Sequence, residues 1–147
     1  MRDLIRKIDA RIIGQLRKIE VPLARFAIFV VYFWFGALKL FGESPAKPLV
    51  ESLFDQTISF ISFEVFFVGF ALFEILIAIL FIFRGFERTA IFLLALHIAI
   101  TALPLIFLPE MTWQKFLVPT LEGQYIIKNI LIVASAAVVG AKLVRRQ

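Results

Sequence analysis

Cysteine is absent from this chain of 147 residues, and histidine occurs once, as His97. A chain without thiols forms no disulfide, no thiolate metal site and no iron–sulfur cluster. One histidine does not supply the two axial ligands of a bis-histidine haem, and no motif with metal-ligand spacing surrounds it. The sequence therefore predicts no metal site and no redox centre made by the protein itself.

Long polar stretches are also scarce. The composition is 61% hydrophobic with 18 phenylalanines, and the mean hydropathy is +0.94. Soluble domains average about 45–50% apolar residues. The chain is therefore expected to be an integral membrane protein, of a length that suits four spans and short loops.

The hydrophobic runs predict an all-α membrane protein, a single-domain four-transmembrane-helix bundle. A hydrocarbon core of about 30 Å requires roughly 20 apolar residues in a helix. Pro104 is expected to kink the third span. The predicted spans are 22–41, 58–83, 89–108 and 124–140, joined by an outer loop (42–57), a cytoplasmic turn (84–88) and an outer interfacial loop (109–123).

The segment 1–20 predicts an amphipathic helix on the membrane surface, ahead of the first span. Its apolar residues recur at steps of three and four, with basic residues between them. They are Leu4, Ile5, Ile8, Ile12, Leu16 and Ile19. Simple anchoring is the favoured interpretation, and regulated lipid sensing is the alternative.

Basic residues give the expected orientation. Twelve of the 16 lysines and arginines lie between Arg2 and Arg25, in the 84–88 turn and in the basic tail (141–147). By the positive-inside rule, both termini are expected in the cytoplasm, in a bacterial-type inner membrane. This topology accounts for the net charge of +5 without a nucleic-acid partner.

Two carboxylates interrupt the second span, Glu64 and Glu74. A glutamate at such depth is costly and is expected to face protein or trapped water. At a helical rise of 1.5 Å per residue, Glu74 and His97 lie roughly 13 and 12 Å from the cytoplasmic edge. They are therefore candidates for a contact between neighbouring helices. In the alternative, the helices rotate them apart and a protonated Glu74 bonds to a backbone carbonyl.

A second polar level is expected nearer the outer surface. Glu64, Lys128 and Lys39 would line an outward-facing pocket there, with Tyr125 and Asn129 at similar depth. In the alternative, the lysines extend outward to the interface and form no pair. Trp34 and Tyr32 fall between the two levels and could form a flat aromatic slot, although packing alone explains most rings.

Three short motifs carry a family resemblance over roughly residues 23–139. Gly36-Ala-Leu-Lys39-Leu40 resembles the Gly-x-x-Lys-Leu element of DoxX-like membrane proteins. Phe73-Glu74-Ile75-Leu76 with the later Arg84-Gly85 and Arg88 resembles the second span and basic turn of that family. Gly123-Gln124-Tyr125-Ile126-Ile127-Lys128-Asn129 is similar to the entry of the fourth span in the YkgB-type branch. In contrast, Ala78 stands where the family commonly has glycine, and His97 matches no family position.

The resemblance implies a four-helix membrane bundle, in a family with some quinone-linked oxidoreductase subunits and some members tied to oxidative-stress resistance. The expected function is a redox-accessory subunit that binds a quinone or similar lipophilic ligand, with no covalently bound cofactor. Whether the chain is an enzyme is left open, because no self-contained catalytic centre is visible. One alternative is a non-catalytic subunit or assembly factor that docks a partner protein. Whether the chain forms a homo-oligomer is left open. The other is a small-solute transporter that acts as an oligomer.

Overall fold

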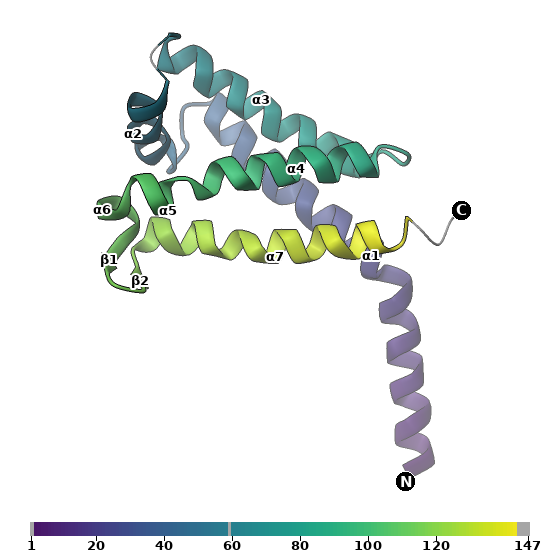
Figure 1. Cartoon of the computed structure of the whole chain (residues 1–147). Coiled ribbons are helices and arrows are strands. Elements are labelled where there is room, and N and C mark those ends of the chain that lie inside the picture. The colour runs from purple at the N-terminus through teal and green to yellow at the C-terminus, as the bar shows by residue number, and fades with distance from the viewer. Residues whose placement is uncertain (1, 59, 144–147) are drawn as a thin grey trace.

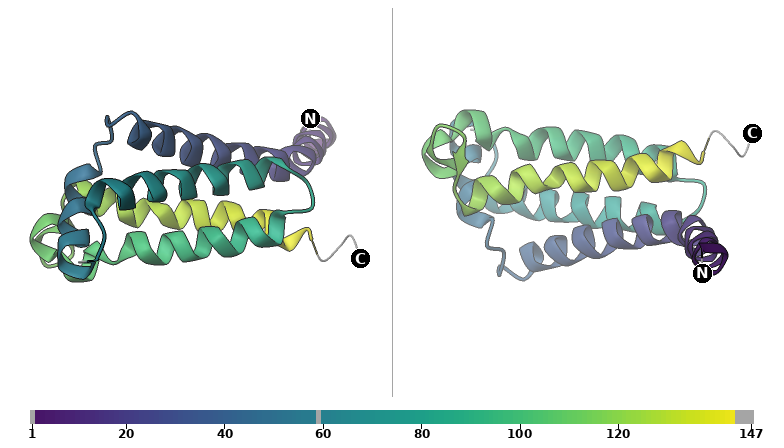
Figure 2. Two further views of the ribbon diagram at one scale, coloured as in Figure 1. Left: turned by 90° about the horizontal axis from the view of Figure 1, so that it is seen from above. Right: turned by 90° about the horizontal axis from the view of Figure 1, so that it is seen from below.

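The computed structural model describes residues 2–58 and 60–143. Four helical segments in these ranges are long and apolar enough to cross a membrane, which confirms the predicted helical membrane fold. They are α1 (Arg2–Leu40), α3 (Phe63–Ile82), α4 (Glu87–Ala102) with α5 (Pro104–Phe107), and α7 (Leu121–Ala141). Helix α1 packs against α3 and α7, and α4 packs against the same two helices (Figures 1 and 2). Parts of the predicted N-terminal helix, second span and basic tail (residues 1, 59 and 144–147) lie outside the described residues.

Helix α1 is longer than predicted. The sequence suggested a surface helix and a separate first span, whereas α1 is one helix of 39 residues that contains Pro22. Proline removes one backbone hydrogen bond and its ring crowds the preceding turn, so it bends a helix that packing otherwise keeps continuous. In Figure 1 the N-terminal half of α1 projects away from the bundle. We call the end of the bundle where it departs the elbow end, and the opposite end the loop end.

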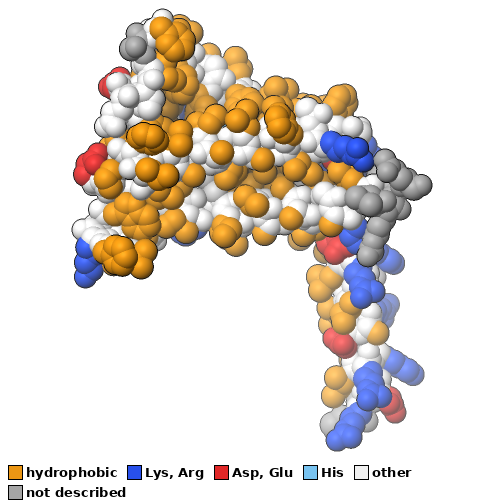
Figure 3. Space-filling view, viewed as in Figure 1, with side chains coloured by type: hydrophobic (Ala, Val, Ile, Leu, Met, Phe, Trp, Pro, Cys, Tyr) orange, Lys and Arg blue, Asp and Glu red, His pale blue; other side chains and the backbone are white. Residues whose placement is uncertain are grey.

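The projecting half of α1 keeps its apolar side chains uncovered. Leu4, Ile8 and Leu16 are each more than half exposed. In Figure 3 hydrophobic side chains line the edge of this segment that faces along the bundle, and most basic side chains project from the opposite edge. Such an arrangement is typical of a helix that lies in a membrane surface.

The loop end is more structured than predicted. The predicted outer loop 42–57 contains α2 (Lys47–Thr57), and α3 begins at Phe63 and not at residue 58. The second loop contains α6 (Pro109–Thr112) and an antiparallel hairpin of β1 (Trp113–Lys115) and β2 (Val118–Pro119). Pro104 separates α4 from α5, in agreement with the expected break.

The elbow end is held by Arg25 of α1. Its Nε donates to the carbonyl of Phe81 at 2.6 Å, and its Nη2 donates to that of Ile82 at 3.0 Å. Its Nη1 lies 2.7 Å from a carboxylate oxygen of Glu87. The other oxygen of Glu87 accepts from the backbone N–H of Gly85, whose φ of 96° is one that glycine adopts readily. Arg25 thus satisfies carbonyls at the end of α3 that the helix leaves without partners.

The apolar core lies between the four long helices. Apart from Phe81, its most enclosed members are small or branched, and most large hydrophobic side chains instead cover the outside of the bundle (Figure 3). A lipid environment accepts that surface, whereas in water it would promote association. The core cluster consists of Ile28, Tyr32, Ile77, Ala78, Phe81, Ala90, Leu94, Ala136 and Val139.

Gly123 allows the start of α7 to pack closely against the loop end. A Cβ at this position would lie 3.0 Å from Pro119 and in direct overlap with the carbonyl oxygen of Thr112. Thr120 caps the helix by accepting from the backbone N–H of Gly123 at 3.1 Å. The absence of a side chain at residue 123 therefore allows both the cap and the close approach of α6.

We expect Gly123→Ala to lower the free energy of unfolding by about 1–3 kcal/mol, because backbone must move to admit the methyl group. Unfolding in mixed micelles with increasing sodium dodecyl sulfate measures the change. Gly69→Ala is the matched control, since nothing lies within 4 Å of its new Cβ. An equal loss in the two variants would contradict the close approach at Gly123.

Candidate functional site

A chain of polar side chains connects three of the long helices inside the bundle. Lys39 Nζ donates to one carboxylate oxygen of Glu74 at 2.6 Å, and the other oxygen lies 3.0 Å from His97 Nε2. On the far side of the imidazole ring, His97 Nδ1 lies 3.0 Å from the hydroxyl of Tyr32. All four residues are buried, each at most 6% exposed. We call Tyr32, Lys39, Glu74 and His97 the core network.

The sequence places the network on one face of α1. Tyr32, Gly36 and Lys39 follow at steps of four and three, so they point in the same direction. Gly36 is essential to the geometry, because a Cβ there would lie 2.8 Å from Ile75 and 3.0 Å from the carbonyl oxygen of Ala71. Its missing side chain brings α1 against α3 beside Glu74, within reach of the lysine.

Aromatic rings surround the imidazole. The ring of Phe70 stacks on His97 with centroids 5.0 Å apart and planes 17° apart. Phe66 extends the same column, with its centroid 5.8 Å from Phe70 and an interplanar angle of 11°. Lys39 Nζ lies 5.6 Å from the centroid of Phe70, close enough for a cation–π contribution. The network therefore adjoins a column of nearly parallel rings.

The predicted contact between Glu74 and His97 is present, and Lys39 joins it. The predicted partnership of Lys39 with Glu64 is wrong. Glu64 lies in the first turn of α3, exposed, ten residues or about 15 Å of helix from Glu74. Gly36 packs against the Glu74 turn, so Lys39 lies near that level and not at the outer surface.

The remaining predicted site residues do not meet the network. Lys128 is exposed, and its Nζ lies 5.5 Å from the ring of Tyr125, which is itself 60% exposed. Asn129 is only half-buried. The outward-facing pocket with Glu64, Lys39 and Lys128 on its wall is thus not formed. Trp34 is 64% exposed, because it follows the inward Tyr32 by two residues, about 200° around the helix.

Two features of the site were missed from sequence. Phe70 lies one turn before Glu74 on the same face, a spacing that marks it as a neighbour of the carboxylate. The hydroxyl of Tyr32 had been considered only as part of an aromatic slot. Each signal was present in the helical spacing, but it becomes informative only when the inward faces are known.

The arrangement can hold and relay a proton. Tyrosine, histidine, glutamate and lysine each exchange protons, and here they form one continuous hydrogen-bonded chain. Ionisable groups at this depth are costly and usually belong to functional sites. Within residues 2–58 and 60–143, no group of three or more His, Asp or Glu side chains is placed to bind a metal ion.

Comparison with known proteins adds no relative. No protein-family model matches the chain, and neither a curated protein nor a solved structure is found to match it.

The core network yields a stability prediction. Lys39→Met leaves Glu74 without its cation, and Glu74→Gln leaves Lys39 without its anion, whereas the double variant leaves no charge of this pair. We therefore expect the two substitutions to couple by at least about 1 kcal/mol in unfolding free energy. A double-mutant cycle in mixed micelles measures this coupling.

The same cycle on Lys128→Met and Glu64→Gln is the control. It removes the same charges from exposed side chains, and its coupling is expected near zero. Additive effects at Lys39 and Glu74 would contradict the buried ion pair.

Proposed function

We propose that this protein is the membrane subunit of a redox system and binds a quinone or similar lipophilic ring beside the core network. Its resemblance to DoxX-like proteins is the origin of the quinone hypothesis. The chain carries no electron centre that we identify, so the proposal requires a partner that supplies or accepts electrons. A bacterial-type inner membrane with cytoplasmic termini is part of the same proposal.

The observation that carries the proposal is the hydrogen-bonded chain from Lys39 through Glu74 and His97 to Tyr32. Replacing a buried ionic cluster with apolar residues often leaves stability unchanged or improves it, so such a cluster is weak evidence for a purely structural role. A chain of exchangeable protons within apolar helices instead suits chemistry in which protons accompany electrons. A bound quinone would supply that chemistry.

The residues present fit such a ligand. The ring column of Phe66 and Phe70 offers parallel faces on which a flat ring can stack. Lys39 has further N–H donors for a carbonyl oxygen beyond the one that it gives to Glu74, and Glu74 holds this side chain in place. Phe66 and Phe70 are only half-buried, so the column is open to a ligand that arrives through the lipid.

Mass spectrometry of small molecules that co-purify in mild detergent tests this proposal. We expect a ring lipid on the wild type and at least about tenfold less of it on Glu74→Gln. A tenfold loss corresponds to about 1.4 kcal/mol of binding free energy. The substitution removes the charge that orients Lys39 while keeping the side-chain volume.

Glu64→Gln is the matched control, since it makes the same chemical change on the same helix at an exposed position. It is expected to retain the ligand. Equal ligand content in the two variants, or no ring lipid on any of the three proteins, would overturn the proposed site.

A second function, docking of a partner protein, is favoured by one observation on α7. Only 11% of its span is buried, the smallest share among the four spans. Lys128 extends from this uncovered helix, about 10 Å along it from Leu121. A charged group on the outside of a span favours a neighbour that neutralises it. We propose a partner helix with an acidic side chain at this depth.

A photo-crosslinking residue at Leu131, 66% exposed and one turn from Lys128, tests the docking proposal in native membranes. We expect a crosslink to one other membrane protein that falls severalfold in Lys128→Met but persists in Lys115→Met, a matched change in the loop-end hairpin. Crosslinks only between copies of this chain would exclude a different partner on α7.

A further inference from the structure

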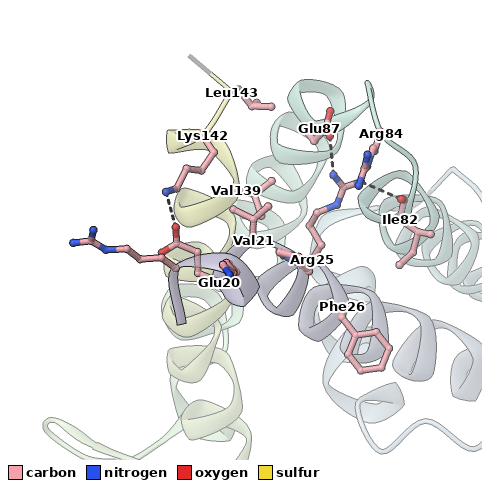
Figure 4. A pocket seen from close by; sticks show the side chains of 13 residues that line it. Glu20, Val21, Arg25, Phe26, Ile82, Arg84, Glu87, Val139, Lys142 and Leu143 are labelled. Atoms are coloured by element: carbon pink, nitrogen blue, oxygen red, sulfur yellow. Dashed lines mark hydrogen bonds and ion pairs between the residues drawn. The ribbon is translucent and has the colours of Figure 1, made fainter. Parts of the chain in front are cut away.

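A charged cavity opens at the elbow end, away from the core network. It has a volume of about 610 Å³ and lies where the projecting half of α1 leaves the bundle, against the adjoining ends of α3, α4 and α7. Figure 4 shows side chains from all of these elements around it. We call this cavity the elbow pocket.

Positive charge dominates the wall of the elbow pocket. Its basic side chains are Arg17, Lys18, Arg25, Arg84 and Lys142, and its acidic side chains are Glu20 and Glu87. Both acids are engaged, because Glu87 pairs with Arg25 at 2.7 Å and Glu20 pairs with Lys142 at 2.5 Å (Figure 4).

Three basic side chains remain in excess. Within the described part of the chain, no carboxylate lies within ion-pair distance of Arg17, Lys18 or Arg84. All three side chains are exposed, so they can turn toward a ligand. A cavity with this surplus attracts an anion with several acceptor oxygens, such as a phosphate group.

The rest of the wall is apolar. Phe26, Ile82, Val139 and Leu143 contribute to it, and Phe26 is 58% exposed. The cavity lies at the end of the membrane-length part of the helices, so a bilayer spanned by these helices would place its headgroups near it. A soluble phosphate would use the basic side chains alone, whereas a phospholipid would also cover this apolar surface.

We propose that the elbow pocket binds the phosphate group of an anionic phospholipid. Arg17, Lys18 and Arg84 contact the headgroup, and the acyl chain lies along Phe26 and Ile82. Basic clusters beside membrane helices commonly bind anionic lipids, and each base contributes roughly a fivefold gain in affinity near such a surface. The two ion pairs keep the walls of the pocket together.

Fluorescence quenching by brominated lipids tests the site in the full-length protein. Phe26→Trp in a Trp34→Phe background places a reporter in the pocket, and the same protein without the reporter gives the signal of Trp113 to subtract. Vesicles of phosphatidylcholine carry a small fraction of brominated phosphatidylglycerol or, for comparison, of brominated phosphatidylcholine. We expect the reporter to show at least about fivefold enrichment of phosphatidylglycerol over phosphatidylcholine.

Two sets of substitutions distinguish the pocket from general surface charge. Arg17→Gln with Lys18→Gln and Arg84→Gln is expected to abolish the enrichment. Arg2→Gln with Arg6→Gln and Lys7→Gln removes the same charge from α1 outside the pocket and is expected to preserve it. Equal loss in both sets, or no enrichment in the parent protein, would overturn the site.

The source of the phosphate is decided by a competition. Inorganic phosphate replaces chloride at constant ionic strength, and we expect the enrichment of phosphatidylglycerol to remain. Its removal would assign the pocket to a soluble phosphate and overturn the lipid proposal.

Discussion

The carboxylate of Glu74 constrains the bundle more than any other group. It lies on α3 in the interior of an apolar helix assembly, where an unpaired charge would be costly. Lys39 from α1 and His97 from α4 each contact one of its two oxygens. Three helices must therefore meet at one level, each rotated about its axis so that these side chains face one another. The attraction within such a cluster is largely cancelled by desolvation. Its structural effect is therefore to select one arrangement of the helices, and its chemical effect is to concentrate exchangeable protons.

Sequence reasoning predicted the spans and the common depth of Glu74 and His97 because both depend on one short connection. A tight turn joins α3 and α4, so counting residues from that turn places both side chains reliably. The same counting failed for Lys39, whose depth was measured from the outer end of a span. That method assumes that neighbouring helices end in one plane. Gly36 instead lets α1 pack beside the Glu74 turn, while α3 continues about 15 Å beyond it to Glu64.

The spacing of residues in the sequence nevertheless indicates the inward face of α1. Arg25, Ile28, Tyr32, Gly36 and Lys39 follow at steps of three and four and form one stripe along the helix. The average hydropathy of α1 hides this stripe, because the residues on the other sides of the helix are strongly hydrophobic. Among them are the exposed Phe33, Trp34 and Phe35. In a membrane helix, polarity and small size mark the protein-facing side better than hydrophobicity does. Single polar residues, considered one at a time, do not reveal it.

The stripe also relates the two ends of the bundle. Arg25 and Lys39 lie about 21 Å apart on α1, and each anchors the helix by an ion pair to a different neighbour. Pro22 lies just before Arg25, so bending of the projecting segment occurs outside these anchors. Arg25 holds the bundle part of α1 to Glu87 and to the carbonyls at the end of α3. Without these contacts α1 would still pack on α3, where Gly36 and Lys39 contact the Glu74 turn. The two ion pairs therefore fix the bundle part of α1 at separate levels, and the projecting segment begins beyond both of them.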